Sequence, residues 1–131
     1  MLKNDFYTLL SVNTEENRIV GSLLLNVDHA IFKGHFPEIP IVPGVVFLQI
    51  IKEIIELQLN TTFHLREAKN IKFLNFVNPK ETNILHFDIF FSSQASDGLK
   101  VQAQVSSNKA IHFKLSALYE LSKNFDESIT T

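Results

Sequence analysis

The sequence of 131 residues contains no cysteine. A disulfide framework, a thiolate nucleophile and a cysteine-ligated metal site are therefore excluded. Long apolar runs are missing as well, since the longest, at 45–51, is interrupted by Gln49 and is far too short to span a membrane. The opening residues "MLKNDFYTLL" include Asp5 and lack the apolar segment of a signal peptide. We therefore expect a cytoplasmic protein.

Other common signals are absent too. The net charge is only −2, which excludes a strong overall attraction to nucleic acid. The sequence has no internal repeat, no low-complexity segment, no Gly-X-Ser-X-Gly nucleophile motif and no glycine-rich phosphate-binding loop. Its five histidines fall at no metal-ligand spacing. We predict neither a metal ion nor a redox cofactor.

The residues that are present indicate a globular domain. Apolar residues make up 45% of the chain and charged residues 20%, which is typical of a folded protein. We expect residues 1–131 to form one domain, with the polar last ten residues as a frayed tail. The 12 phenylalanines indicate a core of large rings, or an apolar slot that they line.

The pattern of apolar residues predicts an α+β fold. Short alternating segments predict six strands, at 6–12, 18–27, 65–77, 82–93, 99–107 and 110–121. Prolines prevent long regular structure in 28–44, and a single helix is predicted over 44–59, just after Pro43. This helix must cover one face of an antiparallel sheet, in which we expect the last four strands to form a meander.

The predicted helix changes character along its length. Its first two turns are apolar on all sides apart from Gln49, so we expect them to be enclosed. Lys52, Glu53 and Glu56 form a polar side on which the second half should reach solvent. On the strands, His86 and His112 occupy outward positions and are expected to be solvated.

The segment "GHFPEIPIVPG" (34–44) resembles the motif of the β-hydroxyacyl-acyl-carrier-protein dehydratases, which have the hotdog fold. The matching positions are Gly34, His35, Phe36, Pro37, Pro40, Pro43 and Gly44. Residues 70–83 are similar to the next segment of that family. The resemblance implies an antiparallel sheet wrapped around one long central helix. It also implies elimination of water from (3R)-hydroxyacyl thioesters, giving trans-2-enoyl thioesters, in fatty acid or polyene and polyketide synthesis.

The resemblance implies roles for several residues. His35 would be the base that removes the α-proton, because a neutral imidazole is available near pH 7. The backbone N–H of Gly44, at the helix start, would stabilise the negative charge on the thioester oxygen. Phe36, Pro43 and Val45 would contact the substrate. Without the motif, His35 would be read as a loop histidine that bonds backbone groups.

One position departs from the family pattern. The catalytic Glu or Asp of the family falls five residues after the Pro-Gly glycine, where this sequence has Gln49. An amide can hydrogen-bond the β-hydroxyl, or simply satisfy a nearby backbone group, but it cannot donate a proton at neutral pH. Three proton sources stay open: His35 itself, Glu53 one turn along the helix, or a carboxylate of a partner subunit.

Two other functions stay open. Gln49 motivates the first, an acyl-binding subunit with weakened catalysis that pairs with an active homologue. The second is a hotdog thioesterase, against which Gln49 counts because such enzymes orient water with a helix carboxylate. The family implies an acyl carrier protein as partner, in a homodimer or heterodimer whose sites lie at the subunit interface. Lys33, Arg66, Lys69 and Lys72 are candidate contacts for the acidic carrier, although the balance of charges favours an ordinary charged surface slightly.

Overall fold

The computed structural model describes residues 1–34 and 40–122. These residues form six strands and two helices: β1 (Tyr7–Glu15), β2 (Arg18–Leu25), α1 (Ile31–Gly34), α2 (Gly44–Leu59), β3 (Phe63–Phe73), β4 (Ile84–Gln94), β5 (Gly98–Ser106) and β6 (Ile111–Leu121). The long helix has the predicted bounds, and a strand lies in each predicted segment. The tail predicted for the last ten residues lies, apart from Ser122, outside the described residues. No helix in the described part of the chain is long and apolar enough to cross a membrane.

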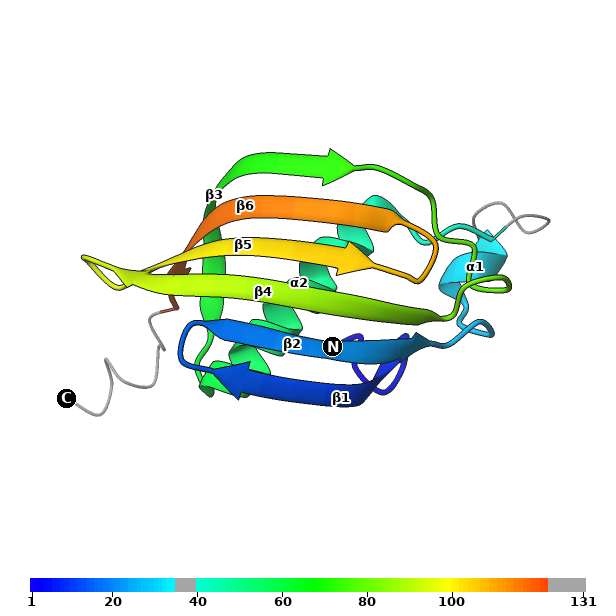
Figure 1. Cartoon of the computed structure of the whole chain (residues 1–131), viewed down its shortest axis with the longest axis horizontal. Coiled ribbons are helices and arrows are strands. Elements are labelled where there is room, and N and C mark those ends of the chain that lie inside the picture. Colours follow the sequence, from blue (N-terminus) through cyan, green and yellow to red (C-terminus); the bar gives the residue numbers. More distant parts are fainter. Residues whose placement is uncertain (35–39, 123–131) are drawn as a thin grey trace.

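All six strands belong to one antiparallel sheet, in the order β1-β2-β4-β5-β6-β3 (Figure 1). Strands β4, β5 and β6 form a meander, but the predicted four-strand meander is wrong because β3 pairs with β6 at the far edge. Burial explains the difference. The alternate residues Leu85, Phe87 and Ile89 of β4 are fully buried, so this strand needs neighbours on both sides, whereas almost every residue of β3 is exposed.

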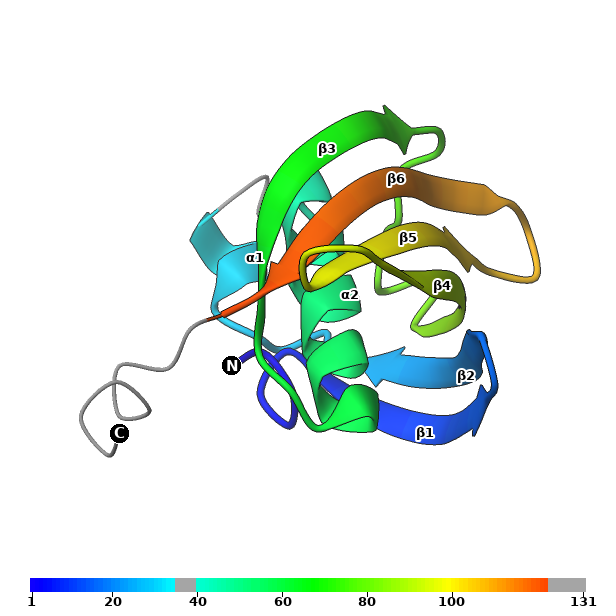
Figure 2. The same ribbon diagram turned by 90° about the vertical axis from the view of Figure 1, so that its left-hand side faces the viewer.

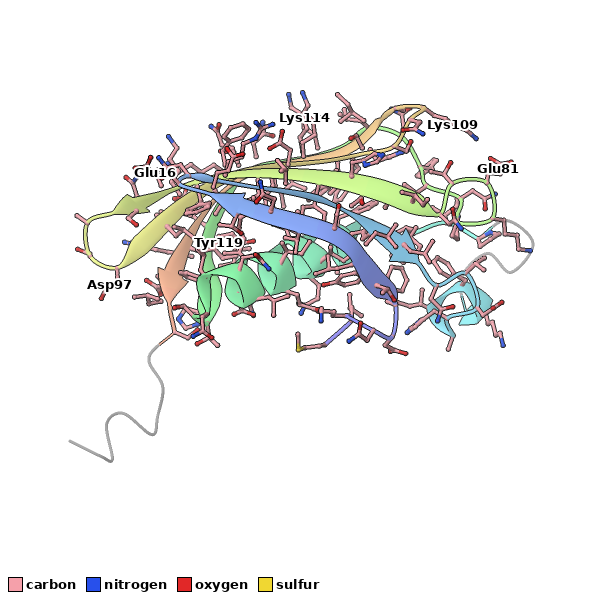
Figure 3. The ribbon with its side chains drawn as sticks, turned by 60° about the horizontal axis from the view of Figure 1, so that its bottom comes forward. Glu16, Glu81, Asp97, Lys109, Lys114 and Tyr119 are labelled. Atoms are coloured by element: carbon pink, nitrogen blue, oxygen red, sulfur yellow. The ribbon has the colours of Figure 1, made fainter. Side chains whose placement is uncertain are left out.

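The sheet curls around α2, which lies on its concave face (Figure 2). One side of the helix is buried there, through Val46, Phe47, Ile50, Ile51, Ile54 and Ile55. Each fully buried side chain of this kind contributes roughly 1.5–3 kcal/mol. The strands supply the matching alternation, so that Tyr119 of β6 points toward the helix while Lys114 of the same strand points away from it (Figure 3). The predicted sheet around one central helix is therefore confirmed.

The surface of α2 differs from the prediction in two places. The first two turns are not enclosed, because Val45 is 68% exposed and Gln49 is exposed as well. Glu53, predicted on the solvent side, is only 2% exposed. The physical reason is that the sheet covers one side of the helix, while residues 2 and 3 lie against Glu53 on another.

His112 is also buried, at 4% exposed, and the prediction that it is solvated is wrong. Its Nδ1 lies 3.0 Å from the carbonyl oxygen of Asn75 and its Nε2 lies 2.7 Å from Ser107 Oγ. A neutral ring with its proton on Nδ1 satisfies both contacts. His86 is exposed, as predicted.

Candidate active site

An apolar cavity of about 670 Å³ lies at the N-terminus of α2. The start of the helix forms one wall, and the end of β3 with the segment 74–77 forms the other. Two backbone hydrogen bonds hold this segment in place, from Val42 N–H to the carbonyl of Val77 at 3.0 Å and from Leu74 N–H to the carbonyl of His112 at 2.9 Å. The cavity is therefore built from elements that are distant in sequence but fixed by the backbone.

Gly44 shapes the floor of the cavity. A Cβ at this position would lie 2.4 Å from the ring of Phe73, closer than any real contact. The ring thus occupies the space that a side chain would take. The helix begins at Gly44 with Pro43 before it, and Pro43 gives no side-chain hydrogen bond to the first N–H groups. The helix start therefore brings partial positive charge to this end of the cavity.

The mouth of the cavity is apolar and exposed. Val45 is 68%, Phe73 59%, Leu74 47% and Phe76 84% exposed. Large apolar side chains gathered around one opening are typical of a surface that binds an apolar ligand or another protein. Val45 was predicted as a substrate contact, whereas Phe73, Leu74 and Phe76 were missed, although they lie within the segment 70–83 that the resemblance had singled out.

The predicted substrate-binding residues Pro43, Gly44 and Val45 all line the cavity. The predicted base His35 and the predicted substrate contact Phe36 lie outside the described residues, so their roles stay predictions. Gln49 is not among the described residues that line the cavity. It lies one helical turn after Val45, and both side chains are exposed on the same side of α2.

Gln49 is bound to Glu53. Gln49 Nε2 donates a hydrogen bond to Glu53 Oε2 at 2.9 Å, as the spacing of four residues on one helix face permits. Glu53 also accepts the backbone N–H of Leu2, at 2.8 Å on Oε2, and that of Lys3, at 2.9 Å on Oε1. The hydroxyl of Tyr7 donates to Oε1 at 3.2 Å. Both carboxylate oxygens are therefore occupied.

These hydrogen bonds decide the charge of Glu53. Burial acts to raise the pKa of the Glu53 carboxyl, but the hydrogen bonds from two backbone N–H groups and from Gln49 and Tyr7 outweigh it, so the pKa lies below its usual value. Burial, together with the Glu53 charge, raises the pKa of Tyr7. Glu53 is thus an ionised, enclosed group, and this state argues against Glu53 as one of the three predicted proton sources.

Sequence reasoning placed Glu53 on the same helix face as Gln49 but missed this network. The spacing of four residues was a usable signal for the Gln49–Glu53 contact. The other partners gave none, because two of them are backbone N–H groups, which every residue except proline carries.

The candidate carrier-binding residues are exposed on two elements. Lys33 belongs to α1, and Arg66, Lys69 and Lys72 belong to the edge strand β3. Lys72 lies directly opposite Lys114 of β6, so two positive charges are neighbours on the outer face of the sheet. In 1–34 and 40–122, no three His, Asp or Glu side chains are arranged to hold a metal ion.

The fold places this chain among the hotdog proteins, and comparison with known proteins identifies the family. The chain belongs to the ApeI-like family, described as ApeI dehydratase, which it matches over residues 11–118. The resemblance to a hotdog dehydratase family is thereby confirmed.

Relatives with a curated name are dehydratases as well. The chain is 30% identical over 119 residues to the 3-hydroxyacyl-[acyl-carrier-protein] dehydratase FabZ of Chlamydia caviae, covering 82% of this chain and 76% of that protein. It is 40% identical to FabZ of Acinetobacter baylyi, but over only 43 residues, 33% of this chain and 29% of that protein.

Solved structures show the same fold. The dehydratase heterocomplex ApeI:P from Xenorhabdus doucetiae matches with a TM-score of 0.68 and 17% identity, covering 88% of this chain and 97% of that chain. A hypothetical thioesterase with coenzyme A from Streptococcus pneumoniae matches with a TM-score of 0.65 and 9% identity, covering 93% of each chain. At such identities the likeness concerns the fold alone.

Proposed function

We propose that this chain is a dehydratase that eliminates water from (3R)-hydroxyacyl thioesters held on acyl carrier protein, giving trans-2-enoyl thioesters for fatty acid or polyene and polyketide synthesis. The observation that carries the proposal is the apolar cavity at the start of α2, directly after the proline motif. Membership of a dehydratase family supports it.

The cavity would hold the acyl chain. Pro43 and Val45 give it apolar walls, and Phe36 would add another. Once its exposed mouth is covered, the apolar cavity would exclude water and strengthen electrostatic contacts at the reacting end of the substrate. The exposed rim of Val45, Phe73, Leu74 and Phe76 would be covered by substrate or by a partner subunit.

The chemistry would use His35 and the helix start. His35 would remove the α-proton, while the Gly44 N–H stabilises the charge that develops on the thioester oxygen. The Phe73 ring occupies the side-chain position of Gly44, so the thioester would not enter that space while the ring stays there. With Glu53 ionised and enclosed, the proton for the leaving hydroxyl would come from His35 or from a partner subunit.

A second candidate function is an acyl-binding subunit with weak catalysis of its own. Gln49 favours it, because this amide has no acidic proton and its nitrogen is bound to Glu53. General acid catalysis contributes about 10²–10⁴ in rate, so a chain without it would benefit from a homologue that supplies a carboxylate. The edge strand β3 and the apolar rim beside it give such a partner a surface.

The test is a single assay that follows enoyl formation and free thiol release together, with 3-hydroxyacyl thioesters of acyl carrier protein as substrates. We expect enoyl formation without thiol release, and loss of it in His35→Ala. If the purified protein catalyses neither dehydration nor the reverse hydration, both alone and together with a homologous subunit, the proposed dehydratase function is contradicted. Thiol release would instead identify a thioesterase.

The carrier surface is tested in the same assay. Reversing the charge of Arg66 and Lys69 to Glu should raise the KM for carrier-bound substrate and leave the KM for the small pantetheine thioester unchanged. Lys109→Glu, in the hairpin between β5 and β6 (Figure 3), is the matched control. Equal effects of both changes would show that β3 is an ordinary charged surface.

A further inference from the structure

We propose that Glu53 is a positioning residue that holds Gln49 with its carbonyl oxygen free, so that Gln49 accepts a hydrogen bond from the β-hydroxyl of the substrate. The inference rests on the proposed function, since it assigns Gln49 a role in binding a 3-hydroxyacyl group. It makes Gln49 a group that orients the leaving hydroxyl and does not protonate it.

The direction of the Gln49 amide follows from charge. An ionised carboxylate can only accept hydrogen bonds, so the amide must turn its N–H groups toward Glu53. The distance of 2.9 Å between Gln49 Nε2 and Glu53 Oε2 is that of a charge-assisted bond. A reversed amide would bring two oxygen atoms into contact. Gln49 Oε1 accepts no hydrogen bond from the residues that the structure describes, so it is free on the exposed side of the helix.

Glu53 is a rigid anchor for this amide. Its side chain is 2% exposed and is held by the N–H groups of Leu2 and Lys3 and by the hydroxyl of Tyr7. Rotation of the carboxylate would leave these donors without their acceptor, which is costly for enclosed groups. The anchor therefore fixes one end of Gln49 and reduces the entropy lost when a ligand binds the other end.

The orientation suits an elimination in which His35 handles the only proton that moves. His35, whose role stays a prediction, would take the α-proton, the bond between the β-carbon and the hydroxyl oxygen would break, and the same proton would pass to that oxygen, so the products would be the enoyl thioester and water. When Gln49 accepts the hydroxyl hydrogen, the lone pairs of the hydroxyl oxygen stay free to receive this proton. A donor in the same place would occupy a lone pair instead.

Binding measurements in a His35→Ala background test the proposal without turnover. The two ligands are a 3-hydroxyacyl pantetheine thioester and the saturated acyl pantetheine thioester of the same length. We expect the hydroxylated ligand to bind about tenfold more tightly, as one good hydrogen bond provides. Adding Glu53→Gln should abolish this preference, because the introduced amide nitrogen faces Gln49, which must then turn its oxygen inward.

Two further variants keep the test decisive if Glu53→Gln folds poorly. Gln49→Leu changes an exposed side chain and should lose the same preference, and Glu53→Gln should add nothing to it, because the two residues act as one unit. The transposed pair, Gln49→Glu with Glu53→Gln, again presents an oxygen to the ligand and should restore the preference.

The side-chain amide signals in NMR report the orientation independently of any ligand. The Gln49 amide protons should be shifted downfield in the wild type and lose this shift in Glu53→Gln. Gln58 is the internal control, because it lies on the same helix and its Oε1 accepts a hydrogen bond from Thr14 Oγ1 at 2.8 Å, so its signals should not change.

The outcomes separate this inference from the proposed function. Unchanged Gln49 signals in Glu53→Gln, or equal binding of the two ligands, would overturn the inference even if the wild type dehydrates its substrate. A preference for the hydroxylated ligand in a protein that catalyses no dehydration would support the role inferred for Gln49 and contradict the proposed dehydratase activity. Failure to bind either ligand would overturn both.

Discussion

The two sides of α2 that are not packed on the sheet are built in different ways. At its start, Gly44, Val45 and Leu48 face an apolar cavity of about 670 Å³ with an exposed rim. On the side of Glu53, a charged group is enclosed and every one of its hydrogen bonds is made within the chain. The first side therefore has an unfilled cavity and exposed apolar side chains. On the second side, both oxygens of the Glu53 carboxylate already accept hydrogen bonds.

This difference separates binding from positioning. Unfilled apolar volume costs stability unless a ligand or partner fills it, so the cavity is a place where another molecule gains by binding. A satisfied polar network gains nothing from a ligand, but it holds its members still. Gln49 lies at the boundary of the two regions: its nitrogen is bound to the network, and its oxygen accepts no hydrogen bond from residues 1–34 and 40–122.

The largest expected effect comes from the packed side of the cavity. Phe47 is 3% exposed, and its ring stacks on Phe113 with 5.3 Å between centroids. Phe47→Ala should lower the free energy of unfolding by about 3–5 kcal/mol, measured by urea denaturation. Val45→Ala, on the same helix but exposed, should change it by less than about 0.5 kcal/mol. Similar losses in the two variants would show that the cavity wall is not packed as described.

The polar side should respond to acid. The pKa of Glu53 is lowered by folding, so its contribution to stability is complete above about pH 4.3, the usual pKa of a glutamate, and is lost as the pH falls through the lower folded value. Glu53→Ala should cost about 3 kcal/mol at pH 7, because enclosed donors lose a charged acceptor.

The pH dependence has two controls. Glu81→Ala, at an exposed position, should change stability by less than about 0.5 kcal/mol at pH 7. Glu53→Gln should be less sensitive to acid than the wild type, since the group that becomes protonated is gone. Denaturation curves between pH 3 and pH 7 measure both. An unchanged acid response in Glu53→Gln would contradict the assignment of a lowered pKa to this residue.

Local patterns predicted one of these regions better than the other. The helix bounds 44–59 and the buried faces of β4, β5 and β6 followed from apolar periodicity, which is a property of neighbouring residues. Pro43, Gly44 and Val45 line one cavity because they are consecutive in the chain, and their role in binding substrate stays a prediction.

The errors have a common cause, which is contact between distant segments. Glu53 was placed in solvent because its partners are residues 2, 3 and 7, more than 40 positions away in the chain. His112 was placed in solvent because the segment around Asn75 covers it. The position of β3 beside β6, at the edge of the sheet, depends on which strands need a neighbour on both sides. The alternation of residues within β3 does not carry that information.

A smaller effect is expected at the floor of the cavity. Gly44→Ala places a Cβ 2.4 Å from the Phe73 ring, which must move. Because Phe73 is 59% exposed, the ring can swing outward, and we expect a loss of only about 1 kcal/mol in stability together with weaker acyl thioester binding. Gly98→Ala is the control, since its Cβ would lie 3.2 Å from Gln94 Cβ and neither residue lines the cavity. A loss of stability without any change in binding would place the ligand elsewhere.

The smallest effect on stability is expected at the rim of the cavity. The rim also gives the sharpest distinction between a binding surface and a packed surface. Phe76 is 84% exposed, so Phe76→Ala should change the free energy of unfolding by less than about 0.5 kcal/mol. If an acyl chain covers this ring, removal of the ring should weaken binding of an acyl pantetheine thioester by about fivefold, the equivalent of roughly 40 Å² of buried apolar surface. Phe90→Ala removes the same ring from the outer face of the sheet, where Phe90 is 49% exposed, and should leave binding unchanged. Equal binding in both variants would mean that the exposed rim serves a protein partner and not the acyl chain, since a ring that contacts the ligand cannot be removed without loss of the apolar contact it makes.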